Sequence, residues 1–271
     1  MVGAAARLRP PVSVTLPQFT QDPETVLAAA VRAESLGFDG VFLFDHLFPL
    51  DGKDRPIVES FVALGSVVAA TRKVRVGTLV LRAPMRDPEA TAQAVVTAQE
   101  LSGGRVVCGL GAADSLSRPE FDAYGIAFGS AEERLSKVSE TIEAIRRGET
   151  STSERVPVWI GGTSRSVQAL AAQSSDGWNV WAVGADWLVE RRRDAVAGTI
   201  SWGGQVLMAR DETDLAEALA RRGSDRGVLT GTISSLPGKF RQLVAAGIDE
   251  FVLSLLGDTW DIFATEVLPH L

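Results

Sequence analysis

The strongest constraint on the fold is a regular alternation between short apolar runs and longer amphipathic stretches. Eight runs rich in Val, Leu, Phe and Ile recur along the 271 residues, at 12–17, 39–44, 74–81, 105–111, 157–161, 177–181, 204–208 and 249–255. Their apolar residues are nearly continuous, which is typical of parallel strands that are buried on both faces. Eight such strands with helices between them predict an α/β fold, a (β/α)₈ TIM barrel, built as a single domain over residues 1–271.

Helix boundaries between these runs follow a repeated pattern. "QDPET" at 21–25 and "RDPEA" at 86–90 both place Asp as N-cap before Pro at the first helical position. "SAEE" at 130–133 has the spacing of a capping box. A doubly wound open sheet is the alternative architecture, but the first strand is followed by "QFTQDPE", which lacks the glycine fingerprint of a dinucleotide-binding turn.

Charge and composition exclude several classes of function. A net charge of −7 and a pI near 5.0 argue against a nucleic-acid partner, because phosphate binding requires clustered Lys and Arg. No stretch resembles a signal peptide or a membrane span, so we expect no membrane partner and a cytoplasmic location. Cys108 is the only cysteine, and its apolar context "RVVCGLG" predicts a buried, inert thiol.

The barrel prediction limits where an active site can lie. In such barrels the site forms at the carboxyl ends of the strands, where this chain carries polar or aromatic groups. These candidates are Gln18 and Phe19, Asp45 and His46, Arg82, Asp114, Gly161 to Ser164, and Trp181.

Three of these candidate groups have a structural explanation beside the functional one. Asp45 and His46 fit either an N-cap Asp with a hydrogen-bonded core His, or a proton-transferring pair at the barrel mouth. "GLGAADS" at 109–115, with Asp114, is either a tight turn or a site that admits a ligand. "GGTS" at 161–164 is either a plain turn or an anion site, in which backbone N–H groups of two glycines and two hydroxyls meet a helix N-terminus.

Unaided hydrolysis and metal catalysis are poorly supported. Apart from His270, near the C-terminus, His46 is the only histidine, and the His, Asp and Glu residues lack metal-ligand spacing, so we expect no metal. No G-x-S-x-G elbow accompanies His46. One imidazole and a phosphate cradle suit a protein that holds a reactive cofactor.

Taken together, these motifs resemble the bacterial luciferase-like family of flavin- and deazaflavin-dependent oxidoreductases, whose members are (β/α)₈ barrels. The resemblance covers about residues 12 to 181 and resumes at 231–255. It is carried by "AESLGFDGVFLFDHL", "VRVGTLVLRAPMRDPEATAQAVVTAQELSGGRVVCGLGA", "PEFDAYGIAFGSAEERLSKVSETIEAIRRG", "VPVWIGGTSRSVQALAAQSSDGWNVW" and "GTISSLPGKFRQLVAAGIDEFVL".

The resemblance implies roles for particular residues. His46, preceded by Asp45, matches the histidine near the reactive centre of the flavin or deazaflavin ring. Leu79 and Val80 match a strand bulge where the family often has a non-prolyl cis peptide beneath the ring. Asp114 matches a Glu that acts on the substrate proton in some deazaflavin-dependent members.

Two further parts of the cofactor site are implied in the same way. Gly161, Gly162 and Thr163 match the loop that binds the cofactor phosphate. Trp181, at the end of the segment "GWNVW", is expected at the same site.

The chain also departs from the family pattern. Leu50 stands where some deazaflavin-dependent sugar dehydrogenases have Trp, Ala113 replaces a usual Gly, and Asp114 is one methylene shorter than Glu. The segment 147–157 is short and 182–204 is compressed. These departures predict a more open pocket, or one that a partner subunit completes.

The resemblance therefore implies an enzyme that uses coenzyme F-420, the deazaflavin, and passes a hydride between it and a small organic substrate. "FDHL" resembles the deazaflavin branch more than the monooxygenase branch. The alternatives are an FMN-dependent monooxygenase and a non-catalytic flavin-binding or assembly subunit. The apolar stretch at 57–70 and the family's habit of dimerising predict a homodimer.

Overall fold

The computed structural model describes residues 9–49, 56–149, 154–191 and 198–271. Within these residues nine strands form one parallel sheet. The strands are β1 (Val12–Thr15), β2 (Gly40–Leu43), β3 (Arg75–Arg82), β4 (Val106–Gly111), β5 (Val158–Gly161), β6 (Gly177–Trp181), β7 (Thr199–Ala209), β8 (Val228–Thr232) and β9 (Glu250–Leu255).

Helices connect these strands along the chain. The α-helices are α1 (Pro23–Ser35), α2 (Ser60–Ala70), α3 (Pro88–Ser102), α4 (Arg118–Ala123), α5 (Ala131–Gly148), α6 (Arg165–Ser174), α7 (Ala185–Arg191), α8 (Glu212–Arg222), α9 (Leu236–Ala245) and α10 (Trp260–Ile262). Short helical turns are η1 (Ala83–Met85), η2 (Ser115–Ser117), η3 (Phe263–Val267) and η4 (Leu268–His270).

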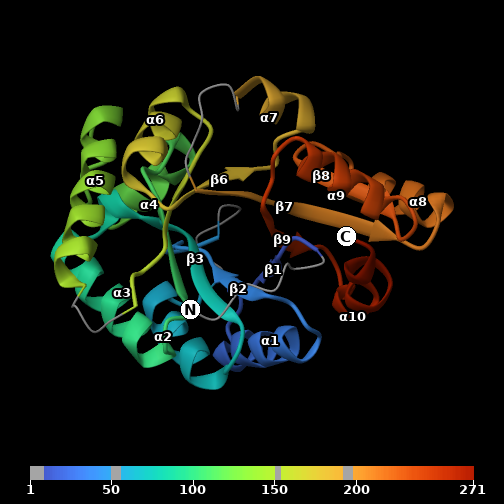
Figure 1. Cartoon of the computed structure of the whole chain (residues 1–271), viewed down its shortest axis with the longest axis horizontal. Coiled ribbons are helices and arrows are strands. Elements are labelled where there is room, and N and C mark those ends of the chain that lie inside the picture. Colours follow the sequence, from blue (N-terminus) through green and yellow to red (C-terminus); the bar gives the residue numbers. More distant parts are fainter. Residues whose placement is uncertain (1–8, 50–55, 150–153, 192–197) are drawn as a thin grey trace.

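The sheet closes into a barrel because β6 pairs with both β5 and β7. Around the barrel the order is β1, β2, β3, β4, β5, β6, β7 and β9, and β9 pairs back onto β1. α1, α2, α3 and α5 follow one another around the outside (Figure 1). The (β/α)₈ barrel is confirmed, and the open doubly wound sheet is excluded by the closure.

One strand was not predicted. β8 pairs only with the second half of β7, from Gln205 to Ala209, and lies outside the closed ring. Its segment "VLTGT" is only partly buried, so it shows no continuous apolar run. β7 also begins at Thr199 rather than at 204, so the stretch at 182–204 holds α7 and the start of a strand.

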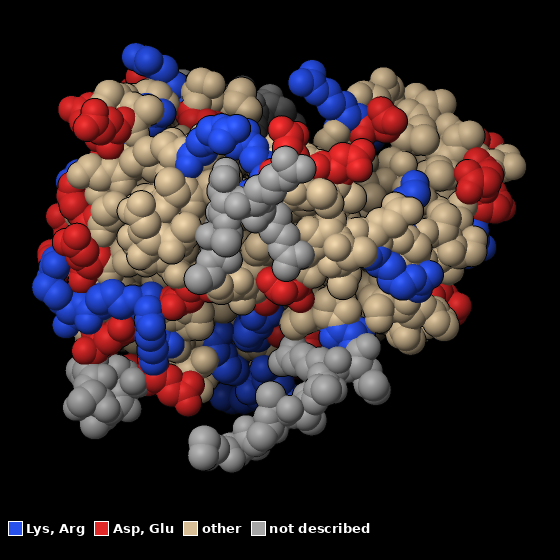
Figure 2. All heavy atoms as spheres, turned by 45° about the horizontal axis from the view of Figure 1, so that its top comes forward, with Lys and Arg blue, Asp and Glu red and all other residues tan. Residues whose placement is uncertain are grey.

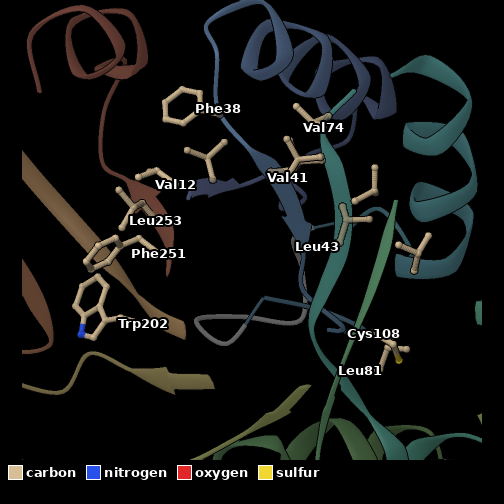
Figure 3. Close-up of a cluster of buried hydrophobic side chains, with 14 of the residues drawn as sticks. Val12, Phe38, Val41, Leu43, Val74, Leu81, Cys108, Trp202, Phe251 and Leu253 are labelled. Carbon is tan, nitrogen blue, oxygen red and sulfur yellow. The ribbon is translucent and has the colours of Figure 1, made fainter. Parts of the chain in front are cut away.

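Apolar side chains form one layer between the strands and the helices and a smaller cluster inside the barrel. The outer layer includes Val41, Leu43 and Leu81 from neighbouring strands (Figure 3). The smaller cluster contains Phe42, Leu79, Val107, Trp159 and Val252. The ring of Phe42 stacks on that of Trp159 at 5.6 Å between centroids, and this packing supports the strand ends above it.

The predicted helix starts are present. The side chains of Asp22 and Asp87 accept backbone hydrogen bonds at the first turns of α1 and α3. Ser130 and Glu133 form the expected capping box of α5. These caps begin each helix at a defined residue, and so set the lengths of the loops at the barrel mouth.

Cys108 is buried as predicted, and burial raises the pKa of its thiol to about 12. Acidic and basic side chains are interspersed on the face shown in Figure 2. Within the described ranges, no helix has the length and apolar character needed to cross a membrane.

Candidate active site

The carboxyl ends of β2 to β6 surround a cavity of about 760 Å³, which we call the first cavity. Its wall includes every residue to which the sequence analysis gave a catalytic or cofactor-binding role. These are Asp45, His46, Leu79, Val80, Asp114, Gly161, Gly162, Thr163 and Trp181. They meet because parallel strands end at the same edge of the barrel.

His46 is held by a buried carboxylate that the sequence analysis did not identify. Its Nδ1 lies 2.9 Å from Oε1 of Glu120, whose Oε2 accepts from the backbone N–H of Leu47 at 2.5 Å. An ionised carboxylate only accepts hydrogen bonds, so Nδ1 carries a hydrogen, and in the neutral form of the ring the lone pair is then on Nε2. No described residue hydrogen-bonds to Nε2, which leaves that atom available to a ligand.

Arg82 holds Glu120 from the other side. Its two terminal nitrogens donate to the two oxygens of Glu120 at 2.7 and 2.8 Å, and both side chains are buried. Burial opposes ionisation of Glu120, but hydrogen bonds from His46, Arg82 and the Leu47 N–H outweigh it and lower the pKa to about 2. Glu120 is therefore a carboxylate at neutral pH.

Asp45 belongs to a second group of charges beside the first. Its Oδ1 accepts from Arg86 at 2.6 Å and from the Ser60 hydroxyl at 2.9 Å, while Oδ2 accepts the backbone N–H of Arg82 at 2.9 Å. Burial opposes ionisation of Asp45, but the hydrogen bond and charge of Arg86 lower its pKa. Protein groups thus engage both oxygens, and the structure gives Asp45 a part in fixing the ends of β2 and β3.

The bulge in β3 contributes to the floor of the first cavity. The peptide bond between Leu79 and Val80 is cis, as the resemblance implied, and β3 shifts its register against β4 at this point. A Cβ on Gly111 would lie 2.4 Å from one methyl of Val80, and a Cβ on Gly161 would lie 2.6 Å from the other. Val80 therefore keeps its place only while both strand ends carry glycine.

The loop between β5 and α6 forms another part of the wall. Ser164 is the N-cap of α6, and its hydroxyl accepts from the backbone N–H of Val167 at 3.2 Å. Gly162 has φ +136°, and its N–H donates to the carbonyl of Asn179 on β6 at 3.1 Å. The expectation that both glycine N–H groups face an anion is therefore wrong for Gly162. The groups that remain to bind an anion are the N-terminus of α6 and the hydroxyls of Thr163 and Ser164.

Arg134, on α5, adds a positive charge to the wall of the same cavity. Its Nε donates to the carbonyl of Ala112 and one terminal nitrogen donates to that of Gly129, both at 3.0 Å. The guanidinium lies 4.1 Å from the ring centroid of Phe128. No acidic residue within the described ranges pairs with Arg134, so this part of the cavity has the chemistry to bind a phosphate or a carboxylate.

Asp114 lies on the same wall, exposed and without a hydrogen bond to His46. Its Oδ1 accepts from the backbone N–H groups of Leu116 and Ser117 at 3.0 and 3.2 Å, which caps η2. Its Oδ2 has no partner among the described residues. One oxygen therefore has a structural role, and the other remains available for a ligand.

Aromatic rings border the first cavity toward the middle of the mouth. Phe44 lies edge-on to Trp181 at 6.0 Å and stacks on Phe19 at 6.1 Å, and Phe19 lies 6.0 Å from the His46 ring. Trp181 is 37% exposed and Phe19 40%, although large aromatic side chains are usually more buried. Exposed rings beside a cavity are suited to contacting a planar ligand.

Glu120, Arg86 and Arg134 were not predicted as site residues from the sequence. Glu120 adjoins Phe121 in "PEFDAYG", and both are buried, but α4 has only six residues and shows no clear periodicity.

Leu50 lies outside the described residues. Ala113, where the family usually has Gly, has a left-handed φ of 57°. The described residues hold no group of His, Cys, Asp and Glu suited to a metal ion.

A family model described as luciferase-like monooxygenase matches residues 2–199. The chain belongs to this family. An F420-dependent glucose-6-phosphate dehydrogenase of Nakamurella multipartita is 33% identical over 179 residues, which cover 58% of this chain and 51% of that protein. A 5,10-methylenetetrahydromethanopterin reductase of Methanolobus tindarius is 29% identical over 176 residues, with 58% and 50% covered. The chain spans about half the length of these curated relatives.

Solved structures resemble nearly the whole chain in fold. An F420-dependent secondary alcohol dehydrogenase in complex with an F420-acetone adduct gives a TM-score of 0.82 at 18% identity, covering 97% of this chain and 99% of that one. EDTA monooxygenase from Chelativorans sp. BNC1 gives 0.75 at 13% identity, covering 96% and 93%. At such identities the likeness shows the fold.

Proposed function

We propose that this luciferase-like protein is an oxidoreductase that binds coenzyme F-420 and transfers a hydride between it and a small organic substrate. The observation that carries the proposal is the pairing, in one cavity, of an oriented His46 with a positively charged anion cradle. Relatives named as F420-dependent glucose-6-phosphate dehydrogenases, 33% and 32% identical over 179 residues, support the choice of cofactor.

The residues of the first cavity fit such a group. The cradle of Thr163, Ser164 and Arg134 would hold its phosphate, and the floor at Leu79 and Val80 would support its planar ring. A cavity of about 760 Å³ also lies within the usual range for cofactor sites. Bound deazaflavin would supply a two-electron donor or acceptor of hydride.

Proton transfer is the task left to the protein. With Nδ1 bonded to Glu120, His46 presents Nε2 as the atom that takes a proton from a substrate hydroxyl, or returns one to a carbonyl. Asp114 is the second candidate for this role through its unpaired oxygen. Trp181 and Phe44 would limit the access of water to the reacting atoms.

Ligand binding to the purified protein tests the proposal. A ligand that binds only the folded state raises its thermal stability, so F-420 at about 100 times its Kd should add roughly 2.7 kcal/mol. FMN is the control ligand. Stabilisation by FMN and not by F-420 would favour the monooxygenase alternative, and stabilisation by neither would favour a non-catalytic subunit.

Homodimeric assembly and a cytoplasmic location stay predictions of the sequence. Light scattering of the purified protein measures the assembly directly.

A further inference from the structure

The first cavity occupies only part of the barrel mouth. The ends of β1 and β9 and the middle of β7, together with α1 and the segment leading into α10, surround a second cavity of about 750 Å³. Phe44 lines both cavities, and Phe19, which stacks on Phe44 and contacts the His46 ring, lines the second one. The second cavity therefore adjoins the first at Phe44, and the rings of Phe19 and Phe44 on its wall lie beside the proposed proton-transferring residue, at 6.0 and 6.4 Å from the His46 ring.

The wall of this second cavity is mostly apolar. Its larger apolar members are Leu16, Pro17, Phe19, Phe44, Leu255 and Trp260. Its uncharged polar members are two threonines, Gln205 and Ser254. The hydroxyls of Thr15 and Ser254 make no hydrogen bond to other described residues, so each can donate to or accept from a ligand.

Among the described residues, Arg32 and Asp258 are the only charged ones on this wall, and they pair with each other at 2.9 Å. Arg32 also donates to Asp261, and the hydrogen bonds that it donates to both carboxylates raise the pKa of Arg32. This group of one cation and two anions has a net charge of −1. An anionic ligand would therefore gain no unpaired cation here and would face a carboxylate.

We propose that the second cavity is the substrate chamber, and that it takes an uncharged molecule with an apolar body and one hydroxyl or carbonyl group. The inference rests on the proposed function, because it assigns the first cavity to the deazaflavin. A sugar phosphate, the kind of substrate for which several relatives are named, has the wrong charge for this wall.

Binding of a small ketone to the ligand-free protein tests the chamber without reference to the cofactor. Cyclohexanone is titrated while the indole N–H of Trp260 is followed by NMR, with Trp260→Phe used for assignment. A saturable shift of this signal is expected, together with no comparable shift on addition of glucose 6-phosphate. The absence of a cyclohexanone shift, or an equal response to glucose 6-phosphate, would overturn the proposal.

Two matched substitutions separate this proposal from the proposed function. Ala29→Phe narrows the second cavity and Ala112→Phe narrows the first. A ring that fills a pocket should weaken cyclohexanone binding to the Ala29 variant by about tenfold or more while leaving F-420 affinity within about twofold, and Ala112→Phe should do the opposite. Ala28→Phe, on the same wall, replaces the Ala29 variant if circular dichroism shows that it does not fold.

The two failures are distinguishable. Absence of F-420 binding to the wild-type protein refutes the proposed function, whatever the Trp260 signal does. Unchanged cyclohexanone binding in the Ala29 variant, with F-420 bound normally, refutes the chamber alone.

Discussion

Replacing Glu120 by Gln removes one charge and changes the hydrogen-bonding groups in the most buried part of the site. The carboxylate meets donors only: Nδ1–H of His46, the N–H of Leu47 and two N–H groups of Arg82. A Gln amide offers one acceptor oxygen and an NH₂ group that would face donors. The variant therefore leaves the Arg82 charge buried without a counter-charge and releases the His46 ring.

The expected cost follows from the pKa of Glu120. It is lowered from 4.5 to about 2, and one pKa unit corresponds to about 1.4 kcal/mol, so the folded state favours the carboxylate by roughly 3 kcal/mol. Because the folded-state pKa is depressed, this stabilisation is complete above pH 4.5 and is lost as the pH falls through about 2. Breaking a buried ion pair by removing one partner costs about 3 to 5 kcal/mol, which agrees.

Urea unfolding at pH 7 measures the loss, and the difference from the wild-type protein should shrink as the pH falls below 4.5. Glu89→Gln is the control, because its pair with Arg147 at 2.6 Å has side chains 69% and 60% exposed and should contribute less than about 1 kcal/mol. Nitrogen NMR should show the Nδ1–H tautomer of His46 in wild type and a mixture in Glu120→Gln. A variant no less stable than the Glu89 control, with the tautomer unchanged, would refute the reasoning.

Other substitutions separate chemistry, packing and capping. His46→Ala should lower turnover with F-420 about 10²- to 10⁴-fold in stopped-flow assays while F-420 still binds; an unchanged rate would exclude His46 as the proton carrier. Gly161→Ala should lower the free energy of unfolding in urea by about 1 to 3 kcal/mol, because the new Cβ would lie 2.6 Å from a methyl of Val80, whose β-branched side chain has little freedom to move away. A variant as stable as the wild-type protein would show that Val80 can shift at little cost. Ser164→Ala should cost about 1 kcal/mol through loss of the α6 cap, and Ser164→Thr should restore most of it.

The barrel was predictable because its signals are local. Continuous apolar runs mark strands that are buried on both faces, and Asp22, Asp87 and Ser130 mark helix starts by their own side chains. β8 carries a weaker signal, since it pairs with one neighbour only and is partly exposed. From the sequence alone, without knowledge of its pairing with β7, β8 could not be distinguished from a loop.

The site was predictable only in part. The rule that barrel strands end at one edge is enough to bring His46, Asp114 and Gly161 to one cavity, without any knowledge of side-chain contacts. The partner of His46 is 74 positions away in the chain, on a six-residue helix, and no local pattern links the two. Likewise, the Gly162 N–H donates to the Asn179 carbonyl, which belongs to the neighbouring strand and not to the loop of Gly162.

The buried charges behind His46 call for an explanation beyond stability. A well-packed apolar set of similar volume is often as stable as a buried ion pair, because the desolvation cost largely offsets the attraction between the charges. Apolar groups, however, cannot accept a hydrogen bond from Nδ1–H of His46. A Glu120 that was equally buried but had no Arg82 beside it would tend to take up a proton. Arg82 keeps Glu120 ionised, Glu120 keeps the hydrogen on Nδ1, and the accepting Nε2 is left for the ligand. The pair is thus explained by the state of the imidazole that it maintains.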